Sequence, residues 1–242
     1  MQSRKPLSEV VTEHLLEKIF TNQYPTGTCL PSENQIGEDL GVSRLTVREA
    51  IKNLTSGNVV QIRRGVGTFI KPTEEWSSFD ALLKYSVSQL DKEKVSGDLI
   101  EVRRMVESGA AYLAAQNRTA QDLVELDAAI IAMEIALSSN NVSAFLLADA
   151  KFHDLILQSS KNIFLSVIFE PLRNFLIEAK MITSSSTDAA QHGIAWHKEI
   201  LAAIAASDAE AARLAMSTHM DQVSEDIREM SHGVKLQNRE IK

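Results

Sequence analysis

The chain has 242 residues and a formal net charge of −7, and this length is enough for two domains of ordinary size. Its one cysteine, Cys29, excludes an internal disulfide framework, and no apolar run approaches the roughly 18 residues that span a bilayer. The N-terminus carries charges and no apolar core segment, so no secretory signal is expected and the composition predicts a soluble cytoplasmic protein.

The charge is divided unevenly along the chain. Residues 1–71 hold 9 Lys/Arg and 7 Asp/Glu, whereas residues 72–242 hold 16 and 25. A uniformly acidic surface would argue against nucleic-acid binding, but here the acid is concentrated in the second part. The asymmetry suggests a DNA-facing domain joined to an acidic body.

Residues 7–22 have apolar side chains at helical spacing, which predicts a first helix. A turn at 24–27 follows, and the stretch 30–53 predicts two short helices joined by a tight turn.

Polar residues and one glycine mark the ends of these two helices. Ser32 is placed to cap the first helix, with Gln35 completing a capping box, and Gly41 supplies its left-handed stop. Ser43 is placed to cap the second helix. A short second helix with arginines at its exposed start is typical of the recognition helix of a helix-turn-helix, which enters the major groove of DNA.

Two β-rich runs, 59–62 and 68–70, flank a basic, glycine-bearing segment and predict a hairpin. Together the helix, the helix-turn-helix and the hairpin predict a winged-helix domain over residues 1–71. Its predicted DNA contacts are basic side chains at the start of the second helix and at the wing tip, namely Arg44, Arg48, Arg63 and Arg64.

The rest of the chain predicts a linker at 72–78 and a helical domain over 79–233, followed by a polar, flexible tail at 234–242. Turn signals divide the helical domain into helices near 79–91, 97–117, 119–138, 142–160, 163–182, 188–206 and 208–231. Helices of this length with short connections predict an antiparallel bundle. The expected fold is therefore mainly α, with a winged helix-turn-helix domain followed by an all-α bundle.

Four polar residues on otherwise apolar helix faces are candidates for a metal site. Asp149 and His153 stand four residues apart, so both project from one face of their helix, and His197 and His219 each lie among apolar residues. One carboxylate and three imidazoles that converge in a bundle suit a divalent transition metal such as Zn, Ni, Mn or Fe. Arg103 facing the same site would bind a carboxylate bidentately.

Each of these residues also has an ordinary structural interpretation. A lone helical histidine is more often a hydrogen-bonded core or surface residue than a ligand, and a spacing of four also occurs on solvated faces. Arg103 lies near Glu101 and Glu107, which equally fits a solvated ion-pair face, and Arg44 and Arg48 fit solvent-facing charges. The sequence contains no Gly-rich phosphate loop before a helix and no nucleophile elbow, so catalysis is not expected.

The N-terminal part resembles the winged-helix domain of the GntR family of bacterial transcription regulators, through YPTGTCLPSE, LGVSRLTVREAIKNL and GVGTFI. The helical part resembles the FCD effector domain that defines the FadR-like branch, through EVRRMVESGAAYLAA, DAKFHDLILQSSKN, WHKEILAAI and MSTHM. Together the two resemblances cover about residues 7–231.

The resemblance implies roles for individual residues. It implies that Asp149, His153, His197 and His219 are metal ligands and that Arg103 meets an acidic effector. It places DNA contacts at Arg44, Thr46 and Arg48 and the wing tip at Gly65 and Gly67. With Ser43 and the wing arginines Arg63 and Arg64, these residues make up the predicted DNA-binding set. Two residues depart from the family pattern, because Asn34 stands where many relatives have a basic residue and Leu45 where a polar residue is frequent. These departures bear on which operator sequence is read.

The expected function is ligand-responsive transcription regulation, as a repressor that acts as a homodimer on a pseudo-palindromic DNA operator. A small carboxylate or sugar acid, bound by the metal and Arg103, is the expected effector. Two alternatives remain. The bundle serves only for dimerisation, with any metal structural, or the same Asp and His residues form a metal-dependent hydrolase or oxygenase site.

Overall fold

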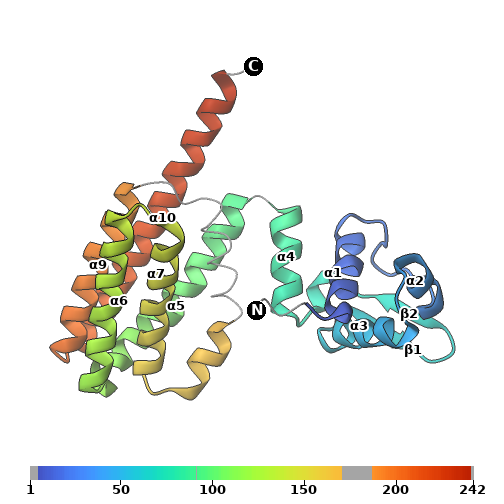
Figure 1. Cartoon of the computed structure of the whole chain (residues 1–242), viewed down its shortest axis with the longest axis horizontal. Helices are drawn as coiled ribbons and strands as arrows, with labels where there is room; N and C mark the ends of the chain where they lie inside the picture. The colour runs from blue at the N-terminus through green and yellow to red at the C-terminus, as the bar shows by residue number, and fades with distance from the viewer. Residues whose placement is uncertain (1–4, 91, 171–186, 241–242) are drawn as a thin grey trace. The chain divides into compact units, whose positions relative to one another are not determined.

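The computed structural model describes residues 5–90, 92–170 and 187–240. Contacts divide the chain into two compact units, Met1–Asp91 and Lys92–Lys242 (Figure 1). The first unit is a small helical domain with one hairpin, and the second is built from helices in the described part of the chain. The predicted fold class, a winged helix-turn-helix domain followed by an all-α bundle, is confirmed.

The first unit begins with three helices, α1 (Leu7–Phe20), α2 (Glu33–Leu40) and α3 (Arg44–Ser56). Their caps follow the sequence. The Ser32 hydroxyl accepts the N–H of Gln35, Gly41 ends α2 at φ 64°, and the Ser43 hydroxyl accepts the N–H of Thr46. The capping box predicted at the start of α2 is only half formed, because the side chain of Gln35 donates to Asp39 instead.

The cap at Ser43 gives a stability prediction. We expect Ser43→Ala to lower the free energy of unfolding of the N-terminal unit by about 1 kcal/mol, because the first turn of α3 loses an acceptor for the N–H of Thr46, now at 3.1 Å. Urea unfolding measures the loss. Ser56→Ala is the matched control, since that exposed hydroxyl only donates to a carbonyl of its own helix. An equal loss in both variants would contradict the assigned cap.

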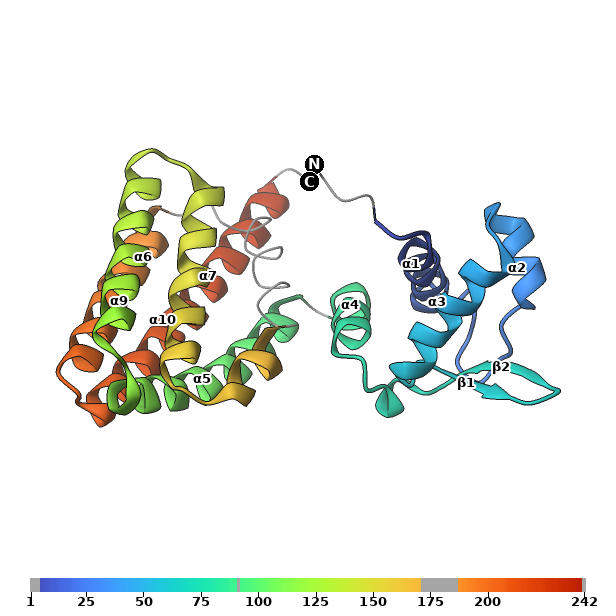
Figure 2. The same cartoon turned by 60° about the horizontal axis from the view of Figure 1, so that its bottom comes forward.

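The wing is an antiparallel hairpin of β1 (Val60–Arg63) and β2 (Gly67–Ile70), which lies beside α3 (Figure 2). Gly65 and Gly67 have φ values of 75° and 150°, which L side chains rarely adopt. A Cβ at Gly67 would also collide with the sulfur of Cys29. The tight turn therefore depends on glycine at both positions.

Residues 72–91 belong to the first unit, which corrects the predicted linker at 72–78 and the predicted start of the bundle at 79. The segment forms a short 3-10 helix, Thr73–Glu75, and α4 (Phe79–Gln89). Trp76 is buried in the core of the winged-helix domain, and its indole N–H donates to the carbonyl of Lys71. Its ring packs against Phe20 and Tyr85, so α4 is fastened to α1 by an aromatic cluster.

The second unit contains α5 (Lys92–Asn117), α6 (Ala120–Ser138), α7 (Val142–Ser159), α9 (Thr187–Ala205) and α10 (Ala209–Glu240). α10 packs along α5 and α9, and α6 packs against α7 and α9 (Figures 1 and 2). The connections α6–α7 and α9–α10 are tight turns, with Asn140 and Ser207 at positive φ. Short connections of this kind make neighbouring helices antiparallel.

Some helix bounds differ from the prediction. α5 begins at Lys92 rather than 97, and α10 runs to Glu240, through most of the segment predicted as a polar tail. Of the helix predicted at 163–182, residues 163–170 are helical and residues 171–182 lie outside the described part of the chain.

The core of the second unit is apolar and rich in alanine where α5 passes between its neighbours. The buried residues of that stretch of α5 are Ala110, Ala111, Ala114 and Ala115. Small side chains let helices approach closely. Arg103 and Glu107, which precede these alanines on α5, are therefore brought near the neighbouring helices. Among the described helices, none is long and apolar enough to cross a membrane.

Candidate metal centre and nucleic-acid interface

The exposed start of α3 carries two arginines that share one carboxylate. Nε of Arg44 donates to Oε2 of Glu33 at 2.9 Å, and Nε of Arg48 lies 3.7 Å from Oε1 of the same residue. Both arginine side chains are about 60 % exposed, so their outer nitrogens face solvent. Glu33 at the start of α2 therefore holds both guanidinium groups in place, a role that the sequence analysis did not assign to it.

The wing tip presents the second predicted set of DNA contacts. Arg63 and Arg64 are exposed, and the guanidinium carbon of Arg63 lies 4.3 Å from the centre of the Phe69 ring. This cation–π contact restrains Arg63 without neutralising its charge. The opposite face of α3 is buried through Val47 and Ile51, as its apolar spacing predicts. The eight predicted contact residues thus lie at the start of α3 and on the hairpin.

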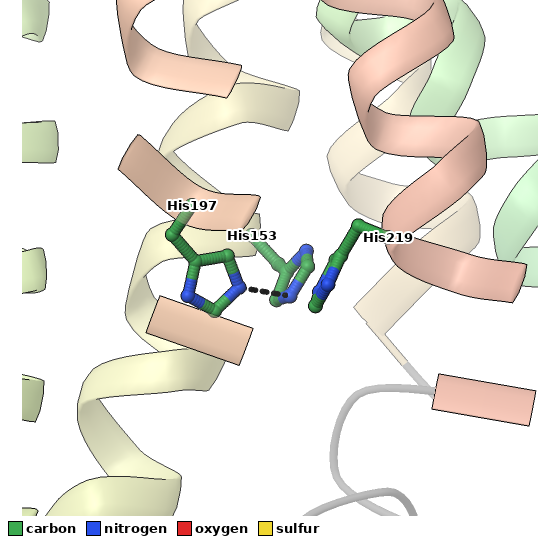
Figure 3. A group of neighbouring side chains, drawn as sticks. All are labelled: His153, His197 and His219. Carbon is green, nitrogen blue, oxygen red and sulfur yellow. Dashed lines mark hydrogen bonds between the residues drawn. The ribbon is translucent and has the colours of Figure 1, made fainter. Parts of the chain in front are cut away.

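The four predicted metal ligands are brought together inside the second unit. Asp149 and His153 lie on α7, His197 on α9 and His219 on α10, and all four are buried. Figure 3 shows the three imidazole rings turned toward one another from their three helices. Residues far apart in the sequence therefore form one cluster, and the interpretation of these histidines as separate surface residues is wrong.

The distances within the cluster fit ligands of one ion. Nε2 of His153 and Nε2 of His197 are 3.4 Å apart, and Oδ1 of Asp149 lies 3.8 and 3.6 Å from them. Two ligand atoms at about 2.1 Å from a tetrahedral metal are separated by about 3.4 Å. A ring nitrogen of His219 lies within 4.8 Å of nitrogens of the other two histidines. Small side-chain rotations would bring all four groups onto one ion.

His219 has the properties of a ligand rather than of a satisfied core residue. Among the described residues, no group forms a hydrogen bond with its Nδ1. Burial, together with the nearby His197 and His153, holds the pKa of His219 well below its usual value. The ring is therefore neutral near pH 7, and neutral imidazole is the form that binds metals.

Arg103 and Glu107, on the inner face of α5, form a buried ion pair beside this cluster. Arg103 is 3 % exposed and Glu107 is 1 % exposed, so the interpretation of this segment as a solvated ion-pair face is wrong. Nε of Arg103 donates to Oε1 of Glu107 at 2.6 Å, and Oε2 of Glu107 lies 2.5 Å from Nδ1 of His153. Glu107 is a site residue that the sequence analysis missed, because the charged residues around Arg103, with Glu101 and Arg104 exposed, favoured a solvated ion-pair face.

Glu107 gives a prediction for the dependence of stability on pH. Burial alone would raise the pKa of Glu107, but the charge of Arg103 and the contact with His153 outweigh burial and lower it to about 2. A carboxyl whose pKa is lower in the folded state stabilises that state above its unfolded value of 4.5. We expect this contribution to disappear as the pH falls from 4.5 to about 2.

The measurement is urea unfolding of the parent and of Glu107→Gln at several pH values, with a chelator present. The difference in free energy of unfolding between the two proteins should shrink across that window. Glu101→Gln, an exposed change on the same helix, serves as the control. A difference that stays constant below pH 4.5 would contradict the lowered pKa.

Comparison with known proteins shows what kind of chain carries these two sites. A family model of the bacterial regulatory proteins of the gntR family matches residues 7–70, and a model of the FCD domain matches residues 98–222. The chain belongs to the GntR family. It is a member of the FadR-like branch, which combines the winged helix with an FCD domain.

Individual relatives agree with the family assignment. The chain is 30 % identical to the HTH-type transcriptional regulator YieP of Escherichia coli, described as uncharacterised, over 88 % of this chain and 91 % of that protein. It is 26 % identical to the galactonate operon transcriptional repressor of the same species, over 89 % and 94 %. A solved structure of Streptococcus agalactiae GntR is 30 % identical, with a TM-score of 0.52, over 90 % and 99 % of the two chains.

This GntR-family chain is therefore a DNA-binding transcription regulator. The prediction of a regulator rather than an enzyme is confirmed, because the family and the relatives are transcription regulators. The individual DNA contacts, the metal ligands and the effector site remain predictions that rest on the geometry described above.

Proposed function

We propose that the chain is a repressor whose operator affinity is controlled by a small carboxylate or sugar acid, bound at a divalent metal ion in the FCD domain. The metal would be Zn, Ni, Mn or Fe, held by Asp149, His153, His197 and His219. The observation that carries this proposal is the convergence of Oδ1 of Asp149 with two imidazole nitrogens at 3.4 to 3.8 Å. Buried polar groups that converge in this way can serve as the ligands of one metal ion.

The charge of the site explains why a carboxylate would need the metal. The site has a net charge of −1 when the imidazoles are counted as neutral ligands. This charge comes from two carboxylates, Asp149 and Glu107, and one guanidinium, Arg103. That charge repels an anion in a buried environment. A divalent ion changes the balance to one positive charge, which favours a monoanionic ligand. When bound, the metal supplies open coordination positions for the oxygen atoms of the effector.

Arg103 and the relatives both favour an acidic effector. A guanidinium group beside a metal can bind a second carboxylate oxygen while the first reaches the ion. One relative is named as the galactonate operon transcriptional repressor, and galactonate is a sugar acid with a carboxylate and neighbouring hydroxyl groups. We infer an effector of that chemical class, and a repressor role, for this chain.

The winged-helix domain would bind the operator as part of a homodimer. Arg44 and Arg48 would contact guanine edges or the adjacent phosphates in the major groove, Thr46 would bond a phosphate or a base, and Arg63 would anchor the wing to the backbone. Two copies of the domain match a pseudo-palindromic operator through their two-fold symmetry. The dimer would have two arrangements that differ in DNA affinity. The effector can change DNA affinity only if it binds one of these arrangements more tightly than the other.

A thermal melt of the purified protein against small carboxylates and sugar acids, with and without a chelator, tests the proposal. A ligand at about 100 times its dissociation constant adds about 2.7 kcal/mol to the folded state, which gives a clear rise in Tm. We expect one acid to raise Tm and the chelator to abolish that rise. If no acid shifts Tm and the chelator changes nothing, the helical domain serves chiefly for dimerisation and the proposal fails.

A further inference from the structure

Glu107 touches both parts of the proposed site. It lies on α5, one helical turn after Arg103, and its side chain is buried. Its two carboxylate oxygens have different partners, since Oε1 accepts from Nε of Arg103 at 2.6 Å and Oε2 lies 2.5 Å from Nδ1 of His153. A single carboxylate therefore joins the arginine assigned to the effector with a histidine assigned to the metal.

The contact with Glu107 determines which nitrogen of His153 carries the proton. A carboxylate can only accept, so the 2.5 Å approach of Oε2 to Nδ1 of His153 favours the tautomer that carries its proton on Nδ1. The lone pair of the neutral ring is then on Nε2, the atom that lies 3.4 Å from Nε2 of His197 and 3.8 Å from Oδ1 of Asp149. The carboxylate also increases the basicity of the ring it holds. Glu107 thus turns the metal-binding nitrogen of His153 toward the other ligands.

The same carboxylate determines which edge of Arg103 is available. Glu107 occupies the edge of the guanidinium formed by Nε and Nη2, with Nη2 3.5 Å from Oε2. The end of the guanidinium group is formed by Nη1 and the outer proton of Nη2. Among the described residues, none forms a hydrogen bond with this end, so it is available to a ligand. A carboxylate effector would therefore bind the end of Arg103 and not its side.

We propose that Glu107 is a positioning residue that fixes the tautomer of His153 for metal binding and orients Arg103 for an effector carboxylate. This inference rests on the proposed function, because it concerns residues around the same site. It assigns to Glu107 a role in both ligand affinities, without direct contact to either ligand.

Metal affinity of the full-length protein tests the inference. Glu107→Gln keeps the size of the side chain but removes the charge, and its amide cannot accept from both partners at once. We expect Zn²⁺, titrated against a competing chelator dye, to bind this variant about 10- to 100-fold more weakly than the parent. Glu101→Gln, an exposed change of the same kind on the same helix, should leave the affinity unchanged.

The tautomer of His153 tests the inference without any mutation, and so does not depend on whether Glu107→Gln folds. Two-bond ¹H–¹⁵N spectra of the metal-free parent distinguish protonated from unprotonated ring nitrogens, and His153→Gln identifies the signals of this ring. We expect Nδ1 to be protonated and Nε2 unprotonated. The opposite tautomer overturns the inference.

The outcomes separate this inference from the proposed function. If the parent binds Zn²⁺ and Glu107→Gln binds it equally well, the inference fails and the proposed metal site stands. If the parent takes up no Zn²⁺, Ni²⁺, Mn²⁺ or Fe²⁺, the proposed function fails, and the inference fails with it. Weaker binding by Glu107→Gln alone, together with the Nδ1–H tautomer, supports the inference.

Discussion

Arg44→Ala should remove specific operator binding while leaving the FCD domain able to bind its metal and effector. A bidentate contact between arginine and guanine contributes about 1–3 kcal/mol, and a dimer loses that contact twice, so the expected cost is about 2–6 kcal/mol. The change also leaves the Glu33 carboxylate with Arg48 alone, at 3.7 Å, so its negative charge near the DNA phosphates is less fully neutralised. Both effects act in the same direction.

Electrophoretic mobility shift or fluorescence anisotropy with operator DNA measures this effect at a fixed salt concentration, with random DNA as the reference. Lys52→Ala is the matched control, because it removes an exposed positive charge from the same helix farther from its start. We expect that control to lose little of the preference for the operator. Equal operator affinity of Arg44→Ala and the parent would refute the assignment of α3 as the recognition helix.

His197→Ala should remove most of the metal affinity of the FCD domain, and with it the response to the acid effector. His197 is fully buried, and its Nε2 lies within 3.6 Å of both Asp149 and His153. Loss of a metal ligand should lower the metal affinity by more than the factor of about 10 to 100 expected when a residue that only orients a ligand is lost. The operator should then be bound equally with and without the acid.

His192→Ala is the matched control, since His192 lies on the same helix and its side chain is 55 % exposed. We expect it to bind Zn²⁺ as the parent does. Melting in the presence of a chelator separates the loss of metal from the cavity that any change at His197 leaves in the core. Unchanged metal affinity in His197→Ala would exclude this residue as a ligand.

Local features of the N-terminal domain were predictable because they depend on neighbours in the sequence. The hydroxyls of Ser32 and Ser43 and the left-handed conformation of Gly41 act within one turn of their own helices. The pair Asp149 and His153 was predictable for the same reason, since a spacing of four places both on one face of α7.

Features that depend on packing between helices were not predictable from the residues alone. The burial of Glu107 depends on packing against other helices, including the contact with His153 of α7, whereas the charged run around Arg103 suggested exposure. The helix spanning 79–89 has apolar spacing that fits either domain, and the ring of Trp76 decides which one it joins. The convergence of His197 and His219 was one of two interpretations that their apolar surroundings in the sequence allowed, and the family resemblance favoured it.

The packing of Trp76 also sets the place at which this regulator can be divided and recombined. A chimera joined after residue 71 would strip Trp76, Ala81 and Tyr85 from the core of the DNA-reading domain and expose the apolar surface they cover. A chimera joined between Asp91 and Lys92 would carry that core intact onto a foreign sensor domain. The unit that can be exchanged is therefore longer than the helix-turn-helix and the wing, because it includes α4 and ends after that helix.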